Sequence, residues 1–117
     1  MTNKQLQALR KLFFLEISEA ATHIAGVDFP LPWKEWEDGI QDVPDYIADA
    51  MLTLADKRMD IIEEIEATLN GDEEMQIDYY ETYEKYKKHF ENPTVVNWRL
   101  SQAIAAYFYG EGLADFD

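Results

Sequence analysis

The sequence predicts a mainly α-helical protein with a phage-repressor-like helix-turn-helix module at the N-terminus, a long connecting helix, and a C-terminal helical dimerisation part with a short β-ribbon. Apolar residues recur at spacings of three and four over most of the 117 residues, which is typical of amphipathic helices. Glycines and prolines interrupt this pattern early in the chain, whereas a longer uninterrupted pattern begins near residue 44. The expected parts are residues 1–43, 44–70 and 71–117.

Two short helices are expected at the start of the chain. The first covers residues 3–14, where apolar side chains fall on one face and Thr2 or Asn3 provides an N-cap. The second covers residues 17–25 and ends at Gly26, since glycine readily adopts the left-handed conformation that closes a helix.

A third short helix and a long one follow. Residues 31–37 are expected to form the third helix, because Pro32 suits a first turn, where no backbone N–H is needed, and Gly39 can end it. Residues 44–69 are expected to form the long helix, capped by residues 70–71. Its apolar stripe consists of Ile47, Met51, Leu54, Ile61, Ile65 and Leu69. The far half of this stripe needs another surface, either the C-terminal segment or a partner chain.

The C-terminal part is expected to contain one strand and two helices. After a polar break at residues 71–74, alternating apolar and polar residues predict a short strand at 75–79. Helices are expected over residues 80–90 and 94–109. Because a lone strand needs a partner, we expect it to pair with its copy in an antiparallel ribbon across a two-fold axis, which predicts a homodimer.

Cysteine content and hydropathy indicate the compartment. The chain has no cysteine, so disulfides and thiolate metal sites are excluded and a reducing cytoplasm is expected. The N-terminus lacks the basic start and apolar run of a signal peptide, and no apolar stretch approaches the about 18 residues of a membrane span. We expect a soluble cytoplasmic protein with no membrane partner.

Catalytic and cofactor motifs are missing from the sequence. The two histidines, His23 and His89, are far apart in the chain, and neither is flanked by another histidine. The sequence has no His-Glu-x-x-His pattern, no phosphate-binding glycine loop and no nucleophile elbow. We therefore expect no enzyme, and no catalytic, cofactor-binding or metal residues.

A small set of residues is expected to hold the first three helices together. Arg10 and Glu37 take the positions at which phage-repressor-type modules carry an ion pair, and a guanidinium can bind a carboxylate through two hydrogen bonds. Trp36 is expected in the core and Gly39 at the helix end. Trp33 either shares that core or lies at its margin, where its indole N–H can reach a phosphate.

The second and third helices are expected to form the helix-turn-helix motif. The second helix of such a motif enters the major groove, so the third helix of this chain is the expected recognition helix. Lys34 is its natural groove residue, and Glu35 can accept a hydrogen bond from a cytosine amino group but repels phosphate. Pro30 and Pro32 remove two backbone N–H donors. The expected DNA contacts are Lys34, Trp33, Ser18, Lys11, Leu31 and Glu35.

The net charge of −14 is unusual for a nucleic-acid-binding protein, which normally presents a basic face to the phosphates. The charge is unevenly distributed. Residues 1–43 carry four basic and seven acidic side chains, whereas residues 44–117 carry six basic and seventeen acidic ones. The acidity therefore lies mainly outside the candidate DNA-binding module.

Residues along nearly the whole chain carry a family resemblance. They are Leu6-Gln7-Ala8-Leu9-Arg10, Ser18-Glu19-Ala20-Ala21, Ile24, Trp33, Trp36-Glu37, Gly39, Val43-Pro44, Asn97-Trp98, Ala103 and Ala105-Ala106. With these residues the sequence resembles the YdiL-like helix-turn-helix family, which includes anti-CRISPR-associated repressors of phages. The chain departs from that family's repressors before its first tryptophan, where a Ser-Pro-Arg-Thr-like segment is replaced by Phe29-Pro30-Leu31-Pro32.

The resemblance implies a two-part protein. Its N-terminal helix-turn-helix would bind an inverted repeat in a promoter, and its C-terminal part would form the dimer. Repression of the protein's own operon and binding to structured RNA are associated with the group. In this chain Leu31 replaces the arginine that would face the bases.

We therefore expect a DNA-binding transcriptional regulator, a repressor that acts as a homodimer on a palindromic operator in double-stranded DNA. The main alternative is a helix-turn-helix fold that binds a basic protein partner through its acidic surface and does not bind DNA. A third possibility is a small-molecule sensor that uses the aromatic C-terminal half, which a fully packed core would argue against.

Overall fold

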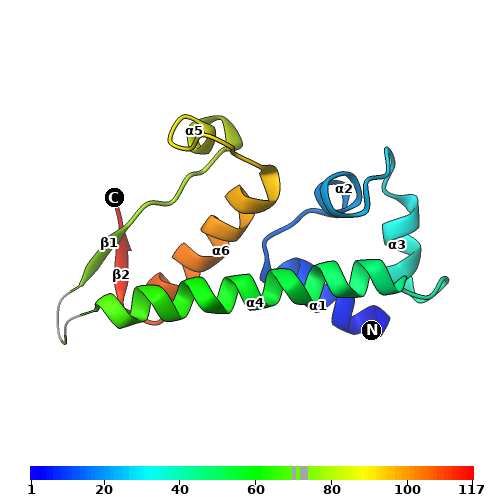
Figure 1. Ribbon diagram of the computed structural model, residues 1–117, viewed down its shortest axis with the longest axis horizontal. Coiled ribbons are helices and arrows are strands. Elements are labelled where there is room, and N and C mark those ends of the chain that lie inside the picture. Colours follow the sequence, from blue (N-terminus) through cyan, green and yellow to red (C-terminus); the bar gives the residue numbers. More distant parts are fainter. Residues whose placement is uncertain (70, 72–73) are drawn as a thin grey trace. The chain divides into compact units, whose positions relative to one another are not determined.

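The computed structural model describes residues 1–69, 71 and 74–117, which form two compact units (Figure 1). Unit 1 is Met1–Asp56 and unit 2 is Lys57–Asp117. The long helix α4 (Asp45–Thr68) contributes its first half to unit 1 and its second half to unit 2. The cap expected at residues 70–71 and the polar break expected at 71–74 lie largely outside the described residues.

Unit 1 begins with the three short helices expected from the sequence. They are α1 (Asn3–Leu12), α2 (Ile17–Ala20), which continues as the π-helical turn η1 (Ala21–Ala25), and α3 (Leu31–Asp38). A reciprocal pair of hydrogen bonds starts α1: the Thr2 hydroxyl accepts from the backbone N–H of Gln5 at 3.1 Å, and the Gln5 side chain accepts from the backbone N–H of Thr2 at 2.9 Å. The π-helical turn was not predicted.

Residues with a left-handed backbone end each of these helices. Gly26 (φ 72°) follows η1 and Gly39 (φ 78°) follows α3, as expected, because glycine adopts this conformation without a steric penalty. After α1 the chain turns at Phe14, a non-glycine residue with φ 63°. This turn stops α1 at Leu12, two residues before the predicted end.

The core of unit 1 is built from the inward faces of its helices. Its fully buried large side chains are Leu6, Phe13, Trp33, Ile47 and Met51. Helices α1 and α3 and the first half of α4 contribute to this cluster, and α2 and η1 add the buried Ala20 and Ala21, so the three short helices pack as one module with the start of α4.

Unit 2 contains α5 (Tyr83–Lys87) and α6 (Val95–Gly110). The helix expected at residues 80–90 is shorter in the structure, because the Thr82 hydroxyl accepts from the backbone N–H of Lys85 and sets the N-terminus of α5 there. The Thr94 hydroxyl caps α6 in the same way.

A two-stranded parallel sheet completes unit 2. Strand β1 (Met75–Ile77) pairs with β2 (Ala114–Phe116) of the same chain, with Met75 opposite Ala114 and Ile77 opposite Phe116. A short β-ribbon is thus present, but the expectation of an antiparallel ribbon between two copies of the strand is wrong. The chain supplies its own second strand, so the lone-strand reason for predicting a dimer no longer applies.

Candidate nucleic-acid interface

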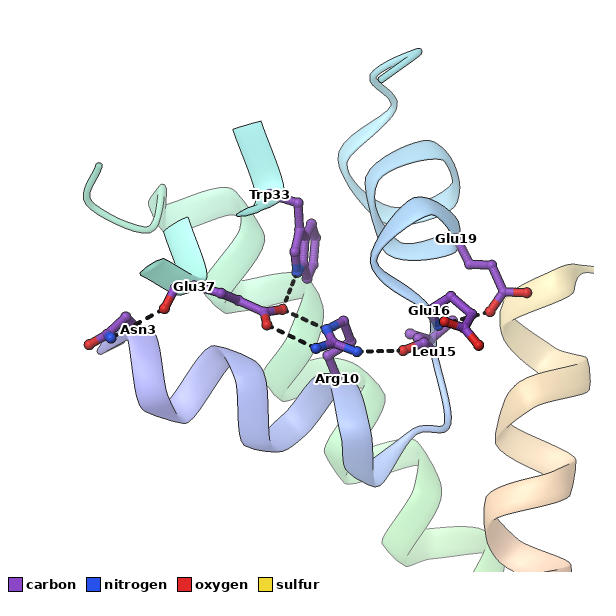
Figure 2. A network of polar contacts seen from close by, with 7 residues as sticks. All are labelled: Asn3, Arg10, Leu15, Glu16, Glu19, Trp33 and Glu37. Carbon is purple, nitrogen blue, oxygen red and sulfur yellow. Dashed lines mark hydrogen bonds and ion pairs between the residues drawn. The ribbon is translucent and has the colours of Figure 1, made fainter. Parts of the chain in front are cut away.

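The inward side of α3 holds a buried ion pair with Arg10 on α1. The Arg10 Nε atom lies 2.6 Å from Glu37 Oε2, and its Nη2 atom lies 2.9 Å from Glu37 Oε1 (Figure 2). The third guanidinium nitrogen, Nη1, donates to the backbone carbonyl of Leu15 at 2.9 Å. The two side chains are only 10% and 3% exposed. The pairing predicted from the sequence is present, with the two-point geometry that a guanidinium and a carboxylate favour.

Two further donors complete the surroundings of Glu37. The indole N–H of Trp33 donates to Glu37 Oε2 at 2.6 Å, and the Asn3 side-chain amide donates to the backbone carbonyl of Glu37 at 3.2 Å. A buried carboxyl group is costly unless it is paired and hydrogen-bonded, and these contacts provide both for Glu37 inside the module. The network ties α3 to α1 and to the turn after α1, and so sets how α3 is presented.

Trp33 therefore has a structural role, which corrects its assignment as a DNA contact. Its side chain is fully buried, and its indole N–H is engaged by Glu37. The ring packs edge-on against Trp36, with 5.6 Å between ring centroids. The spacing of four residues between Trp33 and Glu37, one helical turn, is the sequence signal that identifies this contact.

The outward side of α3 carries a different set of side chains. Leu31, Lys34 and Asp38 are exposed and Glu35 is half-buried. Leu31 lies three and four residues before Lys34 and Glu35, and Asp38 lies four and three residues after them, so the four share one face of the helix. Three of the DNA contacts expected from the sequence, Leu31, Lys34 and Glu35, are thus together on the face that the core leaves open.

The electrostatics of this face are mixed. Lys34 is the single cation of α3, and Glu35 and Asp38 place two carboxylates on the same face. The beginning of the helix offers few donors, because Pro32 in the first turn lacks a backbone N–H. Such a face suits contacts with base edges better than a broad grip on phosphates.

The remaining expected contacts lie on the other two short helices. Ser18 is exposed in α2, and Lys11 is exposed in the last turn of α1. The start of α2 is defined by a side chain, since the backbone N–H of Glu16 donates to Glu19 Oε1 at 2.9 Å (Figure 2). Ser18 and Lys11 are thus both exposed, on helices other than α3.

One exposed residue was not among the candidates drawn from the sequence. Phe29, just before α3, has 56% of its surface exposed, and Leu31 has 54% exposed. Since apolar residues normally gain by burial, the local pattern Phe29-Pro30-Leu31-Pro32 predicts a core segment as readily as a surface one. Only the folded chain distinguishes the two.

Unit 2 contains an open cavity of about 410 Å³ between α4, α5 and α6. Most of its lining is apolar, including Ile61, Ile65 and Ile104, with Asp78 among the polar groups. Burial raises the pKa of the nearby Tyr80 and Tyr86 phenols. Unit 2 therefore does not have the fully packed core that would argue against a small-molecule site.

Metal ligands and membrane-spanning helices are both missing from the part of the chain that the structure describes. There, no cluster of three or more His, Asp or Glu side chains is suited to hold a metal ion. None of the helices described combines the length and the apolar character needed to cross a membrane.

Comparison with known proteins places the chain in a family. The model of the Aca2/YdiL-like family matches residues 1–116. The Aca2 repressor of Pectobacterium phage ZF40 is 42% identical over 115 residues, which cover 98% of each chain. The uncharacterised protein YdiL of Escherichia coli K12 is 27% identical over 116 residues, 97% of each chain. This chain belongs to the Aca2/YdiL-like family.

Proposed function

We propose that this protein is a DNA-binding transcriptional repressor that acts as a homodimer on a palindromic operator, in the cytoplasm and without catalysis. The observation that carries the proposal is the open face of α3, which the buried Arg10–Glu37 pair holds at the surface of a three-helix module. The 42% identity over 98% of both chains with a protein named Aca2 repressor supports it.

In this proposal α3 lies in the major groove. Lys34 donates to a guanine edge or to a phosphate, and Glu35 accepts from a cytosine amino group. Leu31, in the first turn, reaches the bases, because the N-terminal residues of a recognition helix contact base edges. Ser18 and Lys11 contact the sugar-phosphate backbone from α2 and α1.

We infer a dimer because the α3 helix of one copy can contact only a few base pairs. A helix of eight residues presents only a few side chains to the groove, and the net charge of −14 opposes a broad phosphate interface beyond Ser18 and Lys11. Two copies related by a two-fold axis would place their α3 helices in successive major grooves about 34 Å apart. The operator would then be an inverted repeat.

A mobility-shift experiment tests this proposal directly. Purified protein is titrated, at low salt, onto labelled fragments that tile the region upstream of its own gene. We expect one fragment with an inverted repeat to be retarded, and a mass measurement by light scattering to give twice the mass of one chain. Failure to retard any of the fragments would contradict the proposal.

A second candidate function rests on the charge of the molecule. The net charge is −14, and Glu63, Glu64 and Glu66 are exposed on α4. Acidic surfaces attract basic partners and speed their encounter, so this fold can serve as a docking module for a basic protein. Recovery of a basic protein by the immobilised chain, together with no retarded DNA fragment, would favour this candidate.

A further inference from the structure

Two exposed apolar side chains mark the beginning of α3. Phe29 is 56% exposed and Leu31, the first residue of the helix, is 54% exposed. Pro30 and Pro32 alternate with them, and each proline ring restricts its own backbone. The two side chains are therefore presented on a stiff segment, which reduces the conformational entropy that binding would remove.

The same segment is poorly suited to bind phosphate. Pro30 and Pro32 have no backbone N–H, so the start of α3 lacks donors that an anion would use. Asp28, two residues before Pro30, is exposed and adds a negative charge. An apolar surface beside a carboxylate fits an uncharged apolar group on the DNA. It disfavours contact with the negatively charged sugar-phosphate backbone of the DNA.

The major groove offers one such group. The C5 methyl of thymine projects into it and distinguishes a thymine–adenine pair from the other pairs, and apolar side chains are its usual partners. Base edges are reached by the N-terminal residues of a recognition helix, which is where Leu31 stands.

We propose that Leu31 and Phe29 read thymine methyl groups, so that each operator half-site carries thymine where α3 begins. This inference rests on the proposed function of DNA binding. Lys34 and Glu35, one turn further along α3, then read the neighbouring pairs. Specificity at the start of the helix comes from apolar contact in place of a cationic side chain.

Deoxyuridine substitution tests the contact on the DNA side. Uracil pairs with adenine as thymine does and lacks only the methyl group. Single thymines of the retarded fragment are replaced by deoxyuridine, symmetrically in both half-sites, and the dissociation constant is measured for each probe. One buried methyl contributes about 0.8 kcal/mol, so we expect about fourfold weaker binding for each methyl removed at a contacted position.

Variants test the contact on the protein side. Leu31→Ala and Phe29→Ala remove exposed side chains, and alanine is favourable at the helical position of Leu31, so folding is expected to be unaffected. In the double variant, thymine and deoxyuridine probes should bind equally, and the single variants divide the effect between the two residues. Ile40→Ala, a matched change at a residue 66% exposed and outside the α3 face, should keep the full difference.

Each outcome has one meaning. A symmetric pair of thymine positions that weakens wild-type binding about fifteenfold as deoxyuridine, about fourfold for each of the two methyl groups, and loses this effect in the double variant, supports the inference. If the wild-type protein retards the operator but no deoxyuridine position weakens binding, or the double variant stays equally sensitive, the inference is wrong and DNA binding stands. If no fragment is retarded by the wild-type protein, both proposals fail.

Discussion

Glu35 and Glu37 are two residues apart in α3 but lie on opposite faces of the helix, in different environments. Glu37 lies inside the module, where it accepts hydrogen bonds from Arg10 and Trp33 at 2.6 to 2.9 Å. Glu35 lies on the open face with Leu31, Lys34 and Asp38, and is half-buried. The first carboxylate is held by the fold, whereas the second remains available to a ligand.

This difference separates the scaffold from the reading surface. Residues on the inward face determine whether α3 exists in its present orientation, and residues on the outward face determine what it binds. Substitutions on the inward face should therefore change the free energy of unfolding first, and those on the outward face should change binding alone. The following predictions test that separation in order of expected size.

Glu37→Ala should have the largest effect. It leaves the Arg10 guanidinium buried without its partner, and breaking a buried pair in this way costs about 3–5 kcal/mol. The free energy of unfolding, measured by urea denaturation, should fall by that amount. Glu35→Ala is the matched control on the outward face and should stay within about 0.5 kcal/mol. Equal losses from the two substitutions would refute the separation of the faces.

Trp33→Phe should come next. It retains an aromatic ring but removes the indole N–H that donates to Glu37, and a hydrogen bond to a charged group contributes about 1.5–3 kcal/mol. Urea denaturation should show a loss of this size. Trp36→Phe removes a similar volume without touching Glu37 and should cost less. If both substitutions cost the same, the hydrogen bond contributes nothing beyond packing.

The contrast also shows what could be predicted from the sequence. Arg10 and Glu37 could be paired because they take the positions at which phage-repressor-type modules carry an ion pair, and a guanidinium favours two hydrogen bonds to a carboxylate. Trp33 could not be placed, because a residue three positions from a core tryptophan can lie in the core or at its margin. The spacing of four residues allows its indole N–H to donate to Glu37, but only the packing of α3 against α1, which buries Glu37 with Arg10, shows that this contact forms.

Unit 2 illustrates a second limit. Strand β2 has three residues, and its neighbour Gly112 (φ 73°) turns the chain after α6. The alternation that predicted β1 runs over residues 75–79, whereas β2 was not recognised as a strand and is stabilised by pairing with β1, not by its own propensity. The sequence therefore predicted the first strand and left its partner unidentified.

Lys34→Ala should weaken operator binding without changing stability. By the proposed function it removes one cationic side chain per subunit from the DNA, so affinity should fall roughly tenfold and the slope of log K against log salt should flatten by about 0.9 for each phosphate that is no longer neutralised. Lys85→Ala removes the same charge from α5, where Lys85 forms an exposed pair with Glu81; it is the control and should leave the slope unchanged. Equal changes for the two variants would mean that Lys34 acts only through net charge.

Glu35→Gln should have the smallest effect and the opposite sign. Removing a negative charge from the outward face reduces repulsion of the phosphates, so affinity for unrelated DNA at low salt should rise about two- to threefold, and this gain should vanish as salt screens the charge. At the operator the gain should be offset wherever Glu35 accepts from a cytosine amino group, because the glutamine amide can present its N–H there instead. A filter-binding series with operator and unrelated DNA measures both quantities. A loss of affinity for unrelated DNA would show that Glu35 supports the helix, as Glu37 does, and the two faces of α3 would then not be separable.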